Sequence, residues 1–230
     1  RAPTSPNDTA ATHWPLLAYD REKPGLAVGE PKIGLEREDA TRTAKEGMLY
    51  SIGFIRPRYD VSLGLVVAGL DQANRPTEGR VQALGGEGKL ARISIGDEPQ
   101  WPAIPQLTEQ DGRLRFKLVF TTPALFDEKG RSWLPQGFTS TVWCGSLTVP
   151  SGTSIGDVEI VSACVGKPQK VGGCDMKANA PRDLTGYIPA GSVYFCRAPV
   201  GERTKIQQLH GQKHGLKIEY GFGHALVGNW

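Results

Sequence analysis

Long apolar runs are missing from this sequence. None of its 230 residues fall in a stretch that approaches the ~20 apolar residues of a membrane helix. The chain starts at Arg1, and no positively charged segment is followed by an apolar one, so nothing in the sequence indicates a secretion signal. We therefore expect a soluble, cytoplasmic protein without a membrane partner.

A strong excess of one charge is also missing. The formal net charge is +3 and the sequence pI is 8.7. These values lie below the excess that by itself indicates a nucleic-acid-binding protein. Net charge therefore neither predicts RNA as a partner nor excludes it.

Cysteine is scarce and does not show the spacing of a metal site. The four cysteines are Cys144, Cys164, Cys174 and Cys196. No C-x-x-C pair is present that would begin a zinc site. We expect free, buried thiols in a reducing compartment.

The sequence offers no recognisable catalytic constellation. No serine or cysteine nucleophile with its base, and no paired carboxylates, can be identified. His210 and His214 are four residues apart, as two zinc ligands on one helix would be, but no glutamate follows His210 and Gly211 interrupts the helix. We therefore expect no enzymatic activity, no cofactor and no metal ion.

The sequence does contain many turn formers, and it predicts short strands. Its 29 glycines and 17 prolines are scattered without a period. The expected strands cover residues 49–56, 63–68, 80–84, 90–95, 113–121, 140–149, 158–165, 192–197 and 217–220. Short helices are expected over 123–129, with Thr122 as N-cap, and over 202–210. This pattern predicts an α+β fold class.

The composition also suggests where the chain divides. Residues 1–31 are rich in proline and lack periodicity, so we expect a loop or tail. A segment with three prolines, residues 98–105, is expected to connect two halves. The predicted divisions are therefore 1–31, 32–97 and 98–230.

Residues 113–118 alternate basic and apolar side chains. If they form a strand, Arg113, Arg115 and Lys117 share one face, and the other face packs inward. The basic face fits either an ordinary solvated sheet surface or an RNA contact. The residues alone do not choose between these two interpretations.

Two further segments could contact phosphate. Residues 32–47 contain Lys32, Arg37, Arg42 and Lys45 among four acidic residues, which fits either a solvated hairpin or one that grips a single strand. The run from Gly85 to Lys89 lacks the G-K-[ST] ending of a Walker A loop, so it is either a phosphate cradle or a hairpin turn.

The glycine-rich end of the chain does not fit a dinucleotide-binding loop. Such a loop must begin a helix, whereas only two residues follow Gly228. The run from Gly221 to Trp230 is interpreted instead as a glycine-rich loop or terminal strand whose backbone lies close to another backbone.

Several segments, in order, together cover about residues 31–230. They are residues 31–35, 43–50, 84–91, 120–124, 171–175, 188–195 and 221–228. In this order they resemble the Cmr-three family, the Cas-five-group RAMP subunits of type III-B CRISPR effector (Cmr) complexes.

The resemblance implies a fold and a set of partners. The fold would be a RAMP architecture of ferredoxin-like (RRM-type) modules with β-rich insertions. Family members begin with a strand well upstream of the segment at Pro31, so we expect the first module, within 32–97, to be incomplete, and the second to span 98–230. The implied partners are the 5′ handle of the CRISPR RNA, the large Cas-ten-type signature subunit and neighbouring backbone RAMP subunits, in a ribonucleoprotein of antiviral defence.

The resemblance also implies RNA-binding positions. Phosphate contacts, backbone amides and stacking at unpaired bases would provide the binding. The expected RNA-binding residues are Lys32, Arg37, Arg42, Thr43, Lys45, Gly85, Gly86, Gly88, Lys89, Gly221, Gly223 and Gly228. The alternative function is that of a RAMP endoribonuclease that processes precursor RNA, which would need a histidine or similar proton-transfer group.

Overall fold

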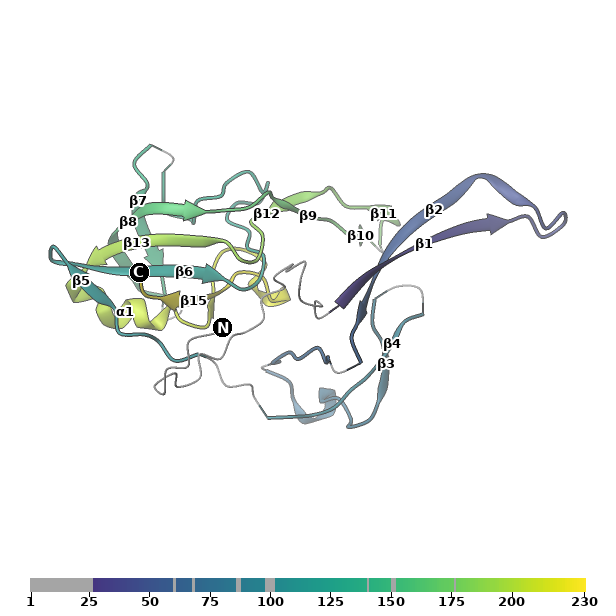
Figure 1. The fold of residues 1–230 in the computed structure, drawn as a ribbon, viewed down its shortest axis with the longest axis horizontal. Helices are drawn as coiled ribbons and strands as arrows, with labels where there is room; N and C mark the ends of the chain where they lie inside the picture. Colours follow the sequence, from purple (N-terminus) through teal and green to yellow (C-terminus); the bar gives the residue numbers. More distant parts are fainter. Residues whose placement is uncertain are drawn as a thin grey trace, which may run out of the picture. The chain divides into compact units, whose positions relative to one another are not determined.

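The fold was analysed in a computed structural model, which describes residues 27–59, 61–67, 69–85, 88–97, 102–139, 141–149, 152–175 and 177–230. The chain divides into two compact units, residues 1–100 (unit 1) and 101–230 (unit 2). It is β-rich with few helices, as predicted (Figure 1). No described helix combines the length and the hydrophobicity that crossing a membrane requires.

Unit 1 is built from two antiparallel hairpins. β1 (Ala27–Arg37) pairs with β2 (Ala44–Pro57), and β3 (Val81–Ala83) pairs with β4 (Leu90–Arg92). A 3-10 turn, η1 (Gln72–Asn74), lies between them in sequence, and Asp71 caps it by accepting a hydrogen bond from the Asn74 amide at 2.9 Å. No described residue of unit 1 is buried.

Unit 2 is organised around an antiparallel sheet. The strand order is β14-β15-β6-β13-β8-β7, and β5 also pairs with β6. These strands are β5 (Thr108–Gln110), β6 (Arg113–Phe120), β7 (Cys144–Thr148), β8 (Ser154–Cys164), β13 (Val193–Pro199), β14 (Gln212–Lys213) and β15 (His224–Gly228). Two small two-stranded sheets pair β9 (Gln169–Val171) with β12 (Thr185–Tyr187) and β10 (Cys174–Asp175) with β11 (Ala180–Pro181).

One face of this sheet carries the hydrophobic core. Along β6 every second residue is buried, which confirms the predicted alternation. The helix α1 (Arg203–Gln208), preceded by η2 (Val200–Glu202), contributes Ile206, and Leu209 at its C-cap is buried in the same core. Phe120 makes edge-to-face contacts with Phe126 and Tyr194 at centroid distances of 5.6 and 5.7 Å. Full burial of such rings contributes about 1.5–3 kcal/mol each.

The predicted helix over residues 123–129 is wrong. The Thr122 hydroxyl donates to the Gly221 carbonyl and accepts from the His224 amide, each at 2.9 Å, so it is not free to cap a helix. Ala124 and Ile188 exchange backbone hydrogen bonds as an isolated bridge. The Asp127 carboxylate accepts hydrogen bonds from the backbone amides of Ser132, Lys129 and Arg131, which fold the segment into a loop. The same hydrogen bonds, the one from Ser132 most strongly, lower the pKa of Asp127.

Two predicted strands and part of the predicted tail are also wrong. Residues 63–67 form no strand, and Ala68 lies outside the described residues. Residues 217–220 form a turn containing η3 (Ile218–Tyr220), because Lys217 adopts a left-handed conformation with a φ of 59°. Residues 27–31 of the expected tail belong to β1, and residues 1–26 lie outside the described residues. The other expected strands and the helix at 202–210 are present with shifted ends.

Candidate nucleic-acid interface

The longest element of unit 1 is the β1–β2 hairpin. Its 11-residue first strand corresponds to a length of about 36 Å at ~3.3 Å per residue. The pairing runs regularly from Ala27 opposite Pro57 to Leu35 opposite Leu49, then shifts before Arg37 pairs with Ala44. The sequence prediction of a hairpin over 32–47 is thus correct in kind, and the hairpin extends further along the chain.

The turn of this hairpin is closed by its own polar groups. The Glu38 amide donates to the Thr43 carbonyl at 2.9 Å, and the Arg42 amide donates to the Glu38 carbonyl at 2.8 Å. The Thr41 and Thr43 hydroxyls are hydrogen-bonded to each other at 2.7 Å. Arg42 takes a left-handed φ of 57°, an uncommon conformation for a residue other than glycine. Thr43 therefore holds the turn in shape beside the cations.

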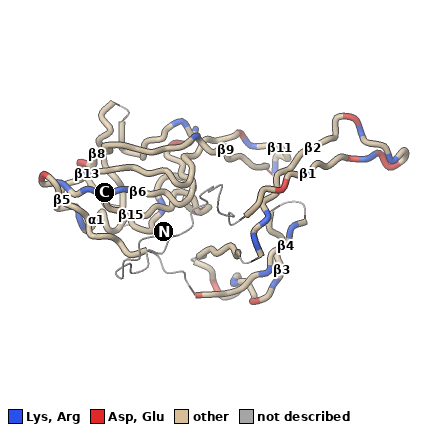
Figure 2. Tube along the Cα trace, in the orientation of Figure 1, with Lys and Arg blue, Asp and Glu red and all other residues tan. Residues whose placement is uncertain are grey.

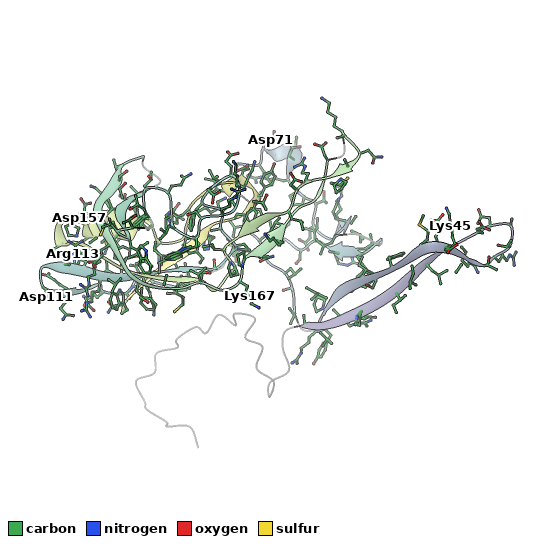
Figure 3. All side chains as sticks on the ribbon, turned by 90° about the horizontal axis from the view of Figure 1, so that it is seen from above. Lys45, Asp71, Asp111, Arg113, Asp157 and Lys167 are labelled. Atoms are coloured by element: carbon green, nitrogen blue, oxygen red, sulfur yellow. The ribbon has the colours of Figure 1, made fainter. Side chains whose placement is uncertain are left out.

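The cations of the hairpin differ in their partners. Lys45 pairs with Glu36 at 2.9 Å, and Figure 3 labels Lys45 toward the turn end of the hairpin. Lys32 lies 3.5 Å from Glu30. No described residue forms an ion pair with Arg37 or Arg42. Exposed pairs contribute only about 0–1 kcal/mol, so an arriving phosphate could replace Glu36 at Lys45.

Glu30 is held ionised near the base of the hairpin. Its carboxylate accepts a hydrogen bond from Arg56 Nη2 at 2.6 Å. The pKa of Glu30 is lowered mainly by this hydrogen bond and to a smaller extent by the charges of Arg56 and Lys32. The Glu30 carboxylate thereby balances the charge of Arg56, so the cations nearer the turn are the better phosphate ligands.

Phe54 brings two of the predicted site residues together. The Lys32 Nζ atom lies 5.2 Å from the Phe54 ring centre, and the Lys89 Nζ atom lies 4.4 Å from it. Lys89 follows the glycine run between β3 and β4, and its carbonyl accepts the Leu84 amide at 3.0 Å. Nothing in the sequence around Phe54 indicates this contact, because only the tertiary structure places a lysine from each hairpin at its ring.

The glycine run is a hairpin connection with left-handed residues. Gly85 and Gly88 have φ angles of 74° and 65°, and a Cβ atom at either would meet nothing within 4 Å. Their backbone is therefore open to an approaching ligand. Gly86 lies outside the described residues. A turn and a phosphate cradle are both compatible with this geometry.

The C-terminal glycines lie in unit 2 and have packing roles there. Gly221 follows η3 with a φ of 86°, and Gly228 lies in β15. Gly223 is buried, and a Cβ atom there would lie 2.0 Å from the His214 carbonyl oxygen. These positions confirm the interpretation as a terminal strand whose backbone lies against another backbone. Their predicted RNA contacts stay a prediction.

The three histidines of unit 2 are engaged in internal hydrogen bonds. His210 Nδ1 accepts the Val227 amide at 3.1 Å, so Nε2 carries the proton toward the Pro102 carbonyl at 2.8 Å. His214 Nε2 lies 3.3 Å from the Leu209 carbonyl, and His224 Nδ1 contacts the Thr121 hydroxyl. Burial lowers the pKa of His214 and of His224. Both rings are therefore neutral near pH 7.

The cysteines are free, as predicted, but their burial differs. Cys196 is buried in the core, and burial raises the pKa of its thiol. Cys144 is half-buried, while Cys164 and Cys174 are exposed, so the expectation of buried thiols is wrong for these two. Within the described ranges, no group of three His, Cys, Asp or Glu side chains gathers as a metal site would require.

Comparisons with known proteins place the chain in a family. A family model described as CRISPR-associated protein (Cas_Cmr3) matches residues 10–230. Among solved structures, the chain is similar to one from "Cryo-EM structure of the Type III-B Cmr-beta bound to cognate target RNA", with 16% identity and a TM-score of 0.43. That match covers 78% of this chain and 46% of the other, so the chain spans less than half of that relative. No curated protein matches. Because the family model covers nearly the whole chain, the chain belongs to the Cmr-three family of CRISPR-associated proteins, as its sequence segments predicted.

Proposed function

We propose that this chain is a non-catalytic subunit of a type III-B CRISPR effector complex, in which it binds the repeat-derived 5′ handle of the CRISPR RNA. In this proposal it docks onto the large Cas-ten-type signature subunit and contacts neighbouring RAMP subunits. Membership of the Cmr-three family supports the CRISPR role. The ferredoxin-like arrangement of the modules belongs to the same proposal.

The observation that carries the RNA-binding proposal is the arrangement of cations on the β1–β2 hairpin. Arg37 precedes the closed turn, Arg42 lies within it, and neither forms an ion pair with any described residue. Guanidinium groups bind phosphate oxygens in a bidentate manner, and they are also flat enough to stack on unpaired bases. A two-stranded arm with such groups at its turn fits a single-stranded RNA.

The paired lysines at Phe54 support a second contact. The two ammonium groups concentrate positive charge around one ring, and a phosphate bound beside that ring would be attracted by both. The open backbone at Gly85 and Gly88 lies next to Lys89 in sequence. Backbone amides can approach a phosphate there without interference from side chains.

The apolar surface of unit 1 supports protein partners. Ile33, Leu49 and Ile55 of the hairpin are 70–78% exposed. Leu63 and Leu65 of the following segment are 73% and 79% exposed. Exposed apolar side chains that gather into larger patches mark interaction sites. Subunits that cover these side chains would stabilise unit 1.

The hairpin can be tested by replacing Arg37, Arg42 and Lys45 together by alanine. Each lost contact to single-stranded RNA should lower the slope of log affinity against log salt by ~0.7. Handle affinity should fall, whereas folding should be retained because all three side chains are exposed. Fluorescence anisotropy with a labelled handle RNA over a salt series measures both quantities.

The matched control replaces Lys129, Lys167 and Lys177, three exposed cations of unit 2, by alanine. It removes the same charge, so a general charge effect would weaken both variants alike. Unchanged affinity and salt slope in the hairpin variant would show that the hairpin is only a solvated connection.

The absence of cleavage is part of the proposal. His210, His214 and His224 are already used in contacts within unit 2, and burial keeps two of them neutral. Labelled RNA incubated with the chain should therefore remain intact. Cleavage that disappears when one of these histidines is replaced by glutamine would favour the processing endoribonuclease instead.

A further inference from the structure

The outer face of the unit 2 sheet is the side opposite the hydrophobic core. It carries the half-exposed residues of β6 and β13, which alternate with buried ones. α1 lies on the core side, where Ile206 and Leu209 are buried. The outer face combines cations and rings: Arg113, Arg115, Lys117, Phe195, Arg197 and Trp230.

Cations outnumber carboxylates on this face. Arg115 lies directly opposite Arg197 in the β6–β13 pairing, and like charges in such positions are unfavourable. Arg113 is paired with Asp157 at 2.8 Å, and Figure 3 shows these two side by side at one end of the sheet. Arg197 reaches Glu159 only at 4.0 Å. In Figure 2 the positive positions follow β6 beside the C-terminal end.

Arg115 and Lys117 form no ion pair with any residue in the described part of the chain. The stem of Lys117 lies over Gly228 of β15, where a Cβ atom would be 2.7 Å from Lys117 Cε. Gly228 thus allows the lysine to lie along the sheet. Of the β6 cations, Arg115 and Lys117 therefore remain available to an anion, whereas Arg113 is paired with Asp157.

Trp230 is fixed on the same face. Its indole Nε1 donates to the Phe116 and Cys196 carbonyls at 2.9 and 3.2 Å. The Arg115 guanidinium lies 4.9 Å from its ring centre, and Phe195 meets it edge-on at 5.5 Å. The Asn229 side chain holds this segment by accepting the Thr108 amide and hydroxyl at 3.1 and 2.8 Å. The rings are therefore immobilised before any ligand binds.

We propose that this outer face is a second binding surface for single-stranded RNA, separate from the hairpin of unit 1. Phosphates bind Arg115, Lys117 and Arg197, and unpaired bases stack on Phe195, Trp230 and the Arg115 guanidinium. An acidic protein segment would use the cations alone and leave the ordered rings without a partner. Because cations and ordered rings occur together on this face, RNA is the favoured ligand.

The test uses the full chain and an unstructured RNA of about 12 nucleotides without the handle sequence, a length within the range of known single-strand sites. Arg115, Lys117 and Arg197 are replaced together by alanine, and binding is followed by anisotropy over a salt series. We expect affinity to fall by at least about tenfold and the salt slope by ~0.7 per contact. The Lys129, Lys167 and Lys177 triple variant, with the same charge loss, should change affinity by less than about twofold.

Ultraviolet cross-linking of the unaltered chain to the same RNA gives a second measurement that does not depend on how the variant folds. Mass spectrometry should find cross-links at Phe195 or Trp230. Unchanged RNA affinity in the triple variant, or cross-links only elsewhere, would overturn the proposal. Loss of association with a protein subunit at unchanged RNA affinity would assign the face to an acidic protein surface.

The hairpin variant separates this inference from the proposed function. If the outer face binds RNA and the hairpin does not, the hairpin variant keeps its affinity for RNA and the outer-face variant loses it. The reverse result would retain handle binding by the hairpin and reject the outer face.

Discussion

The strands β2 and β6 both contain several large apolar side chains, but they differ in burial. Leu114, Phe116 and Phe120 of β6 are completely buried, whereas Leu49 and Ile55 of β2 are 70% and 78% exposed. β6 is covered by a core that α1 and the neighbouring strands complete, while β2 pairs with β1 alone among the described strands. An isolated two-stranded hairpin is marginally stable in water. Apolar side chains therefore stabilise unit 2 internally, whereas those of the unit 1 hairpin are left exposed.

The largest expected difference between the two units is in the local free energy of opening of their strands. In the chain alone, amides of β1 and β2 should exchange with solvent at least about a thousandfold faster than those of β6 and β13, since sub-global openings span from ~0 to the full unfolding free energy. Expression of the chain alone should be poor because unit 1 exposes apolar surface. Hydrogen exchange with and without partner subunits measures this effect. A soluble monomer with equal protection in both units and one sharp melt would contradict it.

Two phenylalanines allow a matched comparison. Phe120→Ala removes a completely buried ring from unit 2 and should lower the free energy of unfolding by about 3–5 kcal/mol. Phe54→Ala in unit 1 should cost less than ~1 kcal/mol, because its ring is half-exposed and contacts lysines. Urea unfolding followed by far-ultraviolet circular dichroism, which reports the strands of both units, gives both values. Equal costs would mean that unit 1 has a core of its own.

Two glycines provide a comparison at the level of the backbone. Gly223→Ala places a methyl group 2.0 Å from the His214 carbonyl oxygen at a φ of 78°, so the backbone must move, at a cost above ~2 kcal/mol. Gly85→Ala has a φ of 74° in open space and should cost about 1–2 kcal/mol. Thermal melts of both variants test which substitution costs more stability. A larger cost for Gly85→Ala than for Gly223→Ala would mean that the glycine run of unit 1 is tightly packed.

The smallest effect concerns pH and should be confined to unit 2. Burial lowers the pKa of His214 and His224 in the folded state, so the unfolded chain binds their protons more readily below the ordinary value of 6.5. The contribution of these two neutral histidines to the free energy of unfolding is complete above pH 6.5 and is lost as the pH falls below that value. Melts of unit 2 at pH 7.5 and 5.5 should show this loss, and His214→Gln should reduce it. The described part of unit 1 contains no histidine, so hairpin binding should not change in this window.

The sequence alone determined the local features of this protein. The alternation in residues 113–118 predicted which side of β6 is buried, because side chains in a strand point to opposite faces by geometry alone. The turn formers and charges at 32–47 predicted a hairpin, and the ordered segments predicted the family. Local rules failed where a distant residue competes for the same group, as at Thr122, whose hydroxyl binds Gly221 and the His224 amide instead of capping a helix.

Tertiary structure alone decided which charged residues lie together. The Lys32–Phe54–Lys89 contact joins two hairpins. Arg115 lies opposite Arg197 because β6 pairs with β13, and it reaches Trp230 because β15, which precedes Trp230, also pairs with β6. Burial of the apolar residues in β6, and their exposure in β2, likewise depends on whether a second layer covers the sheet. These contacts join residues far apart in sequence. Their formation depends on chain closure and packing, which no local pattern specifies.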